Sequence, residues 1–398
     1  MKTKTILVTG SRGFIGKHLM EALGRRAEVQ PLGYDVENSP EELERALTQA
    51  EVIYHLAGVN RPQDPEEFRK GNVEFTRYIC SSLRAHNRKP LIVLSSSIQA
   101  ELENVYGSSK RQAEQILQEW STEAHAPCVV FRLQNVFGKW CRPNYNSVVA
   151  TFCHNIAHDL PISISDPNRA LELVYIDDVV SAFLQLLETP CQGYALRHIS
   201  ETFQVTLGEL AKTIQGFRQS RRTLTLPSLA DAFTRNLYAT YLSYLSTPDF
   251  AYNLDIKADN RGALAEFMKS PHFGQIFVSR TKPGITRGNH YHHTKVEKFL
   301  VLNGDAVVRF RSIQPLPAES KTGVIEYHVS GKDFRVIDIP PGYTHSIENC
   351  GAEDLVVLFW ASEPYDPAKP DTMALPVLSS TTRNRPEGST NSNPVTSP

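Results

Sequence analysis

The stretch ILVTGSRGFIG, residues 6–16, decides the fold of the first half of the chain. A β-branched apolar run, typical of a buried strand, leads into three glycines and then a helical pattern. Gly10 allows a tight turn, Gly13 lets the backbone approach a pyrophosphate, and Gly16 lets helix and strand pack closely. The start of the helix supplies free N–H groups to an anion. We therefore expect a dinucleotide cofactor at Gly10, Arg12, Gly13, Phe14, Ile15 and Gly16.

Outward from this turn, residues 1–190 alternate short apolar runs with helical patterns. VIYHLAG (52–58), LIVLSSS (91–97) and VVFRLQNVFG (129–138) are such runs, and between them apolar residues recur at three- and four-residue spacings. A β-α-β alternation indicates an α/β fold with a doubly wound, Rossmann-type parallel sheet covered by helices on both faces.

The pattern changes near residue 250, where short strands separated by Gly, Pro and Asn turns begin. Such strands, for example 275–281 and 354–361, predict an antiparallel all-β barrel or jelly roll. The residues after Ser379 lack apolar side chains to bury, which predicts disorder. We expect a first domain at 1–246, a second at 247–376 and a disordered tail at 377–398.

The composition excludes several classes of protein. Among 398 residues, 42 Lys and Arg face 43 Asp and Glu, a net charge of −1. This balance argues against nucleic acid or a membrane surface as partner. The sequence contains no secretory signal and no apolar run long enough to span a membrane. Its 6 cysteines form no CxxC pair, which indicates a reducing, cytoplasmic location.

A Tyr and a Lys one helical turn apart form the first candidate catalytic pair. Tyr106 and Lys110 in YGSSK are i and i+4, so they share one helical face. A neighbouring ammonium favours the phenolate, so we expect a lowered pKa and acid–base use near neutrality. Upstream, Ser95, Ser96 and Ser97 end an apolar strand, where doubly wound sheets bind ligands, and one hydroxyl could hold a substrate carbonyl oxygen.

Several motifs in this order resemble the extended short-chain dehydrogenases/reductases over about residues 1–245. They are the glycine turn, HLAG (55–58), GNVEFT (71–76), the serine run, YGSSK, RLQNVFG (132–138) and YIDDVVSAF (175–183). The resemblance implies an NAD(P) cofactor, Tyr106 as proton donor and Lys110 on the nicotinamide ribose. It also implies that Ser96 or Ser97 holds the reacting oxygen. It further places the cofactor at Leu56, Ala57, Gly58 and Asn72 and the sugar nucleotide at Asn135.

The choice between NADPH and NADH depends on two residues. Asp35 follows the second strand, where an acidic side chain binds a ribose 2′-hydroxyl and favours NAD. Arg12 could instead form a bidentate fork with a 2′-phosphate. We expect NADPH, with NADH as the less favoured cofactor.

Histidines gather in the second half, where six of the 13 lie between His272 and His345. His290 and His292 are i and i+2, on one side of a strand, and Glu297 follows on the next. His345 follows a Pro-Pro-Gly turn. Three His and one Glu can hold a divalent metal, and this ligand set is typical of zinc.

These spacings resemble the two motifs of a cupin barrel. Five residues separate Gly284 from His290, four separate His292 from Glu297, and the second motif runs to Asn349. Phe334 stands where that motif has a glycine. The segment around His290 also resembles the base-bearing segment of metal-free dTDP-4-keto-sugar epimerases, so His290 is a ligand or a base. Tyr343, His293 and Lys298 are further proton carriers nearby.

The combination resembles a family of bacterial capsule and O-antigen enzymes. Three segments carry this resemblance, which extends to about residue 375. They are VNRP (59–62), residues 138–153 and YLSYL (241–245), and the first contains the expected substrate-binding residue Arg61. It implies a UDP-linked 4-keto 6-deoxy amino sugar as substrate. The cupin would epimerise carbon 3 and the reductase would reduce carbon 4 with NADPH. The product would be UDP-2-acetamido-2,6-dideoxy-L-talose, a precursor of UDP-N-acetyl-L-fucosamine. In the alternative hypothesis, the cupin is a metal-stabilised dimerisation module. Both hypotheses predict a homodimer.

Overall fold

The computed structural model describes residues 3–189, 191–314 and 323–378. Its contacts divide the chain into two compact units. Unit 1 comprises Met1–Gln219 and Leu229–Phe250, and unit 2 comprises Ser220–Ser228 and Ala251–Pro398. Most of the expected tail, residues 379–398, lies outside the described residues. Within the described part of the chain, no helix is long and apolar enough to cross a bilayer.

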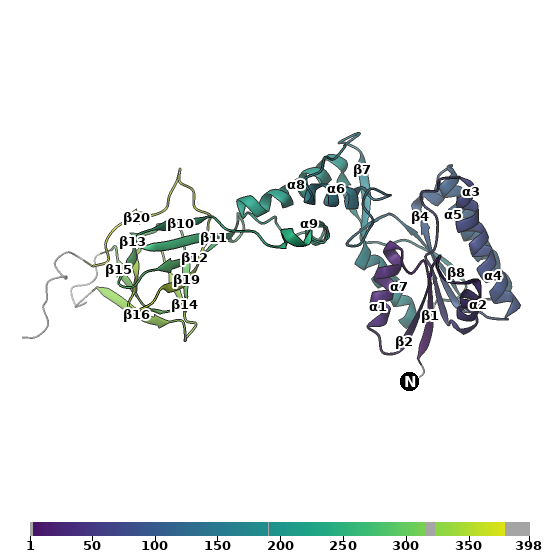
Figure 1. Ribbon diagram of the computed structural model, residues 1–398, viewed down its shortest axis with the longest axis horizontal. Helices are drawn as coiled ribbons and strands as arrows, with labels where there is room; N and C mark the ends of the chain where they lie inside the picture. Colours follow the sequence, from purple (N-terminus) through teal and green to yellow (C-terminus); the bar gives the residue numbers. More distant parts are fainter. Residues whose placement is uncertain (1–2, 190, 315–322, 379–398) are drawn as a thin grey trace, which may run out of the picture. The chain divides into compact units, whose positions relative to one another are not determined.

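Unit 1 is built on a parallel sheet whose strands run in the order β2-β1-β3-β4-β5-β8 (Figure 1). Each neighbouring pair is parallel. The buried strands are nearly continuous apolar runs, as expected when helices cover both faces. Their bounds are β1 (Lys4–Thr9), β2 (Val29–Tyr34), β3 (Val52–His55), β4 (Leu91–Ser97), β5 (Cys128–Leu133) and β8 (Tyr194–Arg197).

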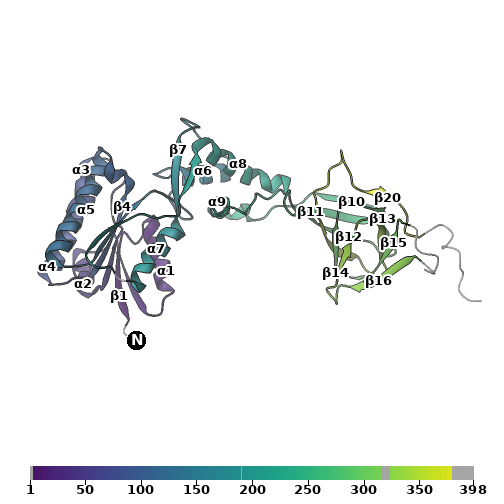
Figure 2. The same cartoon turned by 180° about the vertical axis from the view of Figure 1, so that it is seen from behind.

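Helices cover the two faces of this sheet separately, as both views show (Figures 1 and 2). One face packs against α2, α4 and α5 through a core that includes Leu47 and Trp120. The other packs against α1 and α7 through a core that includes Leu19 and Phe183. The bounds are α1 (Phe14–Gly24), α2 (Pro40–Gln49), α3 (Glu66–Phe68), η1 (Arg69–Glu74), α4 (Phe75–Ala85), η2 (Ile98–Glu101), α5 (Val105–Ala124) and α7 (Ile176–Glu188).

The strand order reverses between β1 and β3. In doubly wound sheets, ligands bind outside the carboxyl ends of the strands at such a switch point. The glycine turn follows β1 and the HLAG segment begins at the end of β3. The topology therefore brings the two predicted cofactor segments to the same edge.

A second, smaller sheet of unit 1 runs β6-β7-β9. It packs with α6, α8 and α9 around Phe137, Phe217 and Tyr241. This is where the aromatic residues of the region 202–246 are buried. The bounds are β6 (Asn135–Phe137), α6 (Val148–Ala157), β7 (Ala170–Tyr175), β9 (Phe203–Thr206), α8 (Leu207–Thr223), α9 (Ala232–Leu242) and η3 (Thr247–Phe250).

Unit 2 contains two antiparallel sheets, as the turn pattern predicted. One runs β10-β11-β12-β19-β14-β17 and the other β16-β15-β18-β13-β20. Their facing side chains, including Phe299, Val308 and Phe359, form one core. The bounds are β10 (Ile256–Asp259), β11 (Gly262–Ser270), β12 (Gly274–Thr281), β13 (Thr286–Tyr291), β14 (Glu297–Asn303), β15 (Asp305–Ser312), β16 (Val324–Ser330), β17 (Val336–Ile339), β18 (Tyr343–Asn349), β19 (Leu355–Ala361) and β20 (Met373–Ala374).

The predicted fold class is confirmed: a Rossmann-type α/β sheet followed by a cupin-like all-β barrel. The backbone conformation at one position of the second cupin motif is the one that a glycine would adopt. Phe334, which stands where the cupin motif has a glycine, has a φ of 46°. Glycine favours this left-handed region and a bulky residue rarely adopts it. The turn therefore keeps the backbone of the motif despite the changed side chain.

Candidate active sites

The glycine turn of unit 1 has no room for side chains at two positions. Gly10 has a φ of +68°, and a Cβ there would lie 2.7 Å from the backbone nitrogen of Ala57. A Cβ on Gly16 would lie 2.1 Å from the carbonyl oxygen of Gly10. The turn thus packs directly against the HLAG segment and against its own helix, which is the close approach that the sequence predicted.

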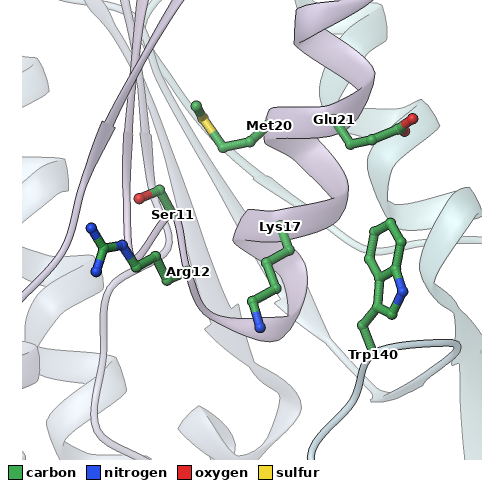
Figure 3. A pocket seen from close by; sticks show the side chains of 6 residues that line it. All are labelled: Ser11, Arg12, Lys17, Met20, Glu21 and Trp140. Carbon is green, nitrogen blue, oxygen red and sulfur yellow. The ribbon is translucent and has the colours of Figure 1, made fainter.

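The amino end of α1 lies at this turn. Gly13 is the N-cap of α1, and no acidic side chain occupies the first turn. The first N–H groups of a helix have no partner within it, and the helix dipole favours an anion there. The backbone at Phe14 and Ile15 therefore fits a pyrophosphate. An open cavity of about 690 Å³ beside it is lined by Ser11, Arg12, Lys17, Met20, Glu21 and Trp140 (Figure 3).

The two residues expected to choose the cofactor are neighbours. The backbone N–H of Arg12 donates to Asp35 Oδ2 at 2.8 Å. The Arg12 guanidinium, 63% exposed, pairs with Glu37. An acceptor for a ribose hydroxyl and a cation for a 2′-phosphate therefore stand side by side at the end of β2.

Tyr106 and Lys110 lie on the first turns of α5, whose N-cap Asn104 accepts a hydrogen bond from Gly107 N at 2.7 Å. Lys110 Nζ lies 6.0 Å from the centroid of the Tyr106 ring. The ammonium is buried and donates to the carbonyl of Ser95 at 3.1 Å. The structure thus brings the pair to the carboxyl end of β4.

Burial changes the acid–base properties of this pair. Burial lowers the pKa of Lys110 to about 8, and the negative charge of Glu114 opposes that shift. Burial raises the pKa of Tyr106, and a hydrogen bond with Ser97 opposes that shift. The predicted lowering of the phenol pKa is therefore wrong in direction, because removal from water disfavours the phenolate.

The two candidate serines point to different partners, because successive strand residues face opposite sides. Ser97 bonds with the Tyr106 side chain. Buried Ser96 donates instead to Glu114, which also accepts a charge-assisted bond from Arg132 at 2.6 Å. Ser97 thus lies with the phenol, and Ser96 belongs to a buried ion-pair network behind Lys110.

Asn72 joins the HLAG segment to α5. It is buried in the π-helical turn η1; its Oδ1 accepts from Val59 N at 2.8 Å and its Nδ2 donates to Ser109 Oγ at 2.9 Å. A Cβ on Gly58 would lie 2.9 Å from Asn72 Oδ1 and 3.0 Å from Lys110 Nζ. This cradle, which a side chain would fill, fits a cofactor lying between the two segments.

The two expected sugar-binding residues lie farther along the chain. Asn135 is exposed on β6 and its amide donates to the carbonyl of Glu172 at 3.2 Å. Arg61 is exposed on the loop after β3. Within the described residues, no bond joins either of them to Tyr106 or Lys110, so their role stays a prediction.

In unit 2 the predicted ligands come together. Ligand atoms of His290, His292, Glu297 and His345 all lie within 4.8 Å of one another. A bulge after Gly288 sets His290 opposite His345 on the neighbouring strand. The cluster therefore joins β13, β14 and β18, although the two ends of its sequence are 55 residues apart.

The ring nitrogens of this cluster fit a metal. The Nε2 atoms of His292 and His345 are buried without a hydrogen bond and lie 3.4 Å and 3.6 Å from Glu297 Oε2. Burying an unpaired polar atom is costly, so an ion that accepts both lone pairs suits the site. His292 Nδ1 bonds to the carbonyl of Asp371, an arrangement common in metal-ligating histidines.

Burial and nearby charges favour the protonation states of the cluster that bind a metal ion. Burial, with the charges of His345 and His292, lowers the pKa of His290 to about 4. Burial alone would raise the pKa of Glu297, but the neighbouring His292 and His345 outweigh it and lower the pKa. A neutral imidazole and an ionised carboxylate are the forms that bind a cation.

Two further residues of this site carry no recognisable signal in the sequence. Lys295 is buried, with Nζ 3.8 Å from Glu297 Oε1 and a bond to Thr372 Oγ1 at 3.3 Å. Asp371 bonds to the loop between the ligands. Lys298, named from the sequence, is exposed and pairs with Asp338. Alternation along β14 could have shown this, because Lys298 follows the inward-facing Glu297.

Two protein families match this chain, one in its first half and one in its second half. Residues 6–200 match the NAD dependent epimerase/dehydratase family. Residues 257–373 match the polysaccharide biosynthesis C-terminal domain. Each match contains one of the two candidate sites.

Full-length relatives share both parts. A UDP-2-acetamido-2,6-β-L-arabino-hexul-4-ose reductase of Pseudomonas aeruginosa is 42% identical over 94% of this chain and 98% of its own. The crystal structure of the capsular polysaccharide assembling protein CapF from Staphylococcus aureus has a TM-score of 0.86 and 46% identity, and covers 94% of this chain and 100% of that one. A Bacillus cereus UDP-glucuronic acid 4-epimerase, at 18% identity and a TM-score of 0.53 over 60% of this chain and 98% of its own, shares the fold.

Proposed function

This chain belongs to the family of the P. aeruginosa hexulose reductase and S. aureus CapF, and on that premise we propose that it is a bifunctional nucleotide-sugar enzyme. Its cupin epimerises carbon 3 of a UDP-2-acetamido-2,6-dideoxy-4-hexulose. Unit 1 then reduces the carbon-4 ketone with NADPH. The product is UDP-2-acetamido-2,6-dideoxy-L-talose, a precursor of UDP-N-acetyl-L-fucosamine for capsule or O-antigen.

The observation that carries the reductase is the Tyr106 phenol bonded to Ser97, with the buried Lys110 ammonium 6.0 Å from the centroid of its ring. Bound NADPH supplies the hydride. Ser97 donates to the carbonyl oxygen and Tyr106 gives that oxygen its proton. Lys110 keeps a positive charge beside the phenol, which favours the phenolate left after transfer. Gly10–Gly16, the HLAG segment and Asn72 hold the cofactor in this proposal, and Asn135 and Arg61 contact the sugar nucleotide.

The epimerase proposal rests on the buried cluster of unit 2. A hydrogen next to a ketone is acidic because the carbonyl oxygen takes the charge when the proton leaves. A divalent metal, zinc in this proposal, held by His290, His292, Glu297 and His345 would polarise that oxygen. Lys295 lies close enough to Glu297 to contribute a second positive charge. Epimerisation needs the ketone and reduction removes it, so reduction comes second and traps the product.

A second function is favoured by how the ligands are placed. They tie three strands of the barrel together, so a metal could serve stability alone. Under that alternative, the cupin is a non-catalytic module for homodimerisation and unit 1 reduces a UDP-4-keto sugar.

In the test, the purified protein reacts with the UDP-4-keto sugar and either NADPH or NADH in heavy water. The metal content of the same protein is measured. We expect NADPH oxidation and deuterium at carbon 3 of the product. A His290→Ala, Glu297→Ala variant should lose the deuterium while still reducing substrate that was epimerised beforehand. Full deuterium incorporation by that variant, if folded, would favour the structural module.

A further inference from the structure

The carboxylate of Asp371 organises the loop that connects two strands of the metal cluster. It accepts hydrogen bonds from the backbone N–H groups of His293, Thr294 and Lys295, each at 2.8 Å. It also accepts the Thr294 hydroxyl at 3.1 Å. Asp371 comes from a distant part of the chain, 79 residues after His292. Charge-assisted bonds of this kind are about twice as strong as neutral ones.

The same residue fixes the ring of one ligand. The carbonyl oxygen of Asp371 bonds to His292 Nδ1. A carbonyl can only accept, so Nδ1 carries the hydrogen, and in the neutral ring Nε2 is then the nitrogen with the lone pair. Nε2 is the atom that faces Glu297. Asp371 thus sets both the loop that precedes Glu297 and the tautomer of His292.

The residues after Asp371 reach the other ligands. In β20, Ala374 pairs with His290 across the sheet. The carbonyl of Leu375 accepts from the hydroxyl of Thr344, the neighbour of His345. Thr372 accepts from Lys295 Nζ. We name residues 371–377 the strap, which ends at Val377, buried and bonded to Asn289 Oδ1 at 3.1 Å.

We propose that the strap is the outer shell of the metal centre and that Asp371 is its main positioning residue, acting through His292 and the loop 293–295. This inference rests on the proposed metal centre. The four ligands lie on or next to three different strands, so their distances depend on whatever links those strands at their ends. The strap supplies that link at β13, at the loop before β14 and at β18.

The test uses the whole protein with Asp371→Asn. The side chain keeps its shape, but its NH₂ group would face backbone N–H donors and the negative charge is gone. The carbonyl bond to His292 stays in place, so the substitution acts through the loop 293–295. Loss of an outer-shell partner typically lowers metal affinity about 10–100-fold, and we expect a fall at the lower end of that range in competition titrations with zinc. In the cobalt-loaded protein, the visible absorption bands should shift and weaken. NADPH binding by unit 1 should not change.

Asp366→Asn is the matched control. Asp366 lies five residues before Asp371, outside the strap. Its carboxylate accepts a hydrogen bond from Ala368 N at 2.8 Å, and within the described residues no hydrogen bond joins it to the loop 293–295. It should bind zinc like the unmodified protein. If Asp371→Asn does not fold, Thr294→Val removes only the hydroxyl bond to Asp371 and should weaken zinc binding several-fold.

The outcomes separate the two proposals. Equal zinc affinity and cobalt spectra in Asp371→Asn and the unmodified protein would overturn the positioning role and leave the metal centre intact. Equal losses in both Asp variants would also overturn it, since a loosened segment would then suffice. An unmodified protein that binds no zinc or cobalt would overturn the metal centre itself.

Discussion

The two candidate sites are built in opposite ways. The site of unit 1 uses short contiguous pieces: the turn 10–16 and one helical turn from Tyr106 to Lys110. The cluster of unit 2 gathers four side chains from three strands and the residues next to them, and the strap near the end of the described chain borders it. Local sequence therefore shapes the first site, whereas strand register shapes the second.

The two sites also differ in the charges that they bury. In unit 1 a buried ammonium lies near a phenol and one carboxylate, Glu114. In unit 2 one buried carboxylate lies among three imidazoles. The first arrangement suits proton donation to an oxygen, and the second suits a cation. Changes in one site should thus leave the chemistry of the other intact, and the following predictions test that separation.

The largest effect is expected for Tyr106→Phe, which removes the proton donor and keeps the ring. General acid catalysis typically contributes about 10²–10⁴-fold, so NADPH oxidation should fall by that factor. Metal content and deuterium exchange at carbon 3 should stay as they were. Loss of both activities in this variant would show one shared site.

Removal of the metal should act on unit 2. A ligand bound 1,000-fold above its Kd stabilises the folded state by about 4 kcal/mol. Chelation should therefore lower the thermal transition of the barrel, while NADP⁺ should raise the transition of unit 1 alone. Calorimetry with each additive in turn makes the comparison, and a single transition that both additives move would contradict it.

The pH profile of the reductase should have a basic limb set by Lys110. Its pKa is about 8 in the folded protein, so the ammonium is present below that pH and is lost above it. We expect kcat/KM to fall about tenfold per pH unit above 8. The unfolded chain still holds this proton up to about pH 10.4, so between pH 8 and 10.4 the unfolded state binds more protons and the contribution of Lys110 to folding stability rises with pH.

Glu114→Gln should move that basic limb to lower pH, because the charge that opposes the shift of Lys110 is removed. Glu101→Gln is the matched control, since Glu101 also bonds to Arg132, at 2.8 Å, but is exposed. Identical limbs in all three proteins would exclude Lys110 as the titrating group.

The smallest effect concerns cofactor choice. A hydrogen bond to a charged group contributes about 1.5–3 kcal/mol, so Arg12→Ala should raise the KM for NADPH roughly 10–100-fold and leave that for NADH unchanged. Glu37→Gln should lower the KM for NADPH, because it frees the guanidinium from its partner. An equal rise for both cofactors in Arg12→Ala would show that Arg12 does not read the 2′-phosphate.

Much of unit 1 was predictable because its signals are local. Gly10 and Gly16 are required by atoms within the same turn or the adjoining segment. The spacing of Tyr106 and Lys110 is a property of any helix. The choice between Ser96 and Ser97, and the direction of the Tyr106 pKa, were not predictable, because both depend on which neighbours the packed helix α5 presents.

In unit 2 the sequence predicted the ligands but not their surroundings. His290 and His292 have the two-residue spacing of a strand, Glu297 begins the next strand, and His345 follows its turn motif. Lys295 and Asp371 carried no recognisable signal, because each acts through contacts with residues of another segment.

By itself, then, the sequence determined the two fold classes, the glycine turn, the Tyr–Lys pair and the four residues of the buried cluster in unit 2. These depend on short-range geometry: backbone φ angles, the helical repeat and the alternation of a strand. Only the tertiary structure decided which serine meets Tyr106, how far burial moves the pKa of Lys110, and which distant residues hold the ligands in place. Those outcomes arise where separate segments exclude water together, and such contacts leave no periodic trace in the chain.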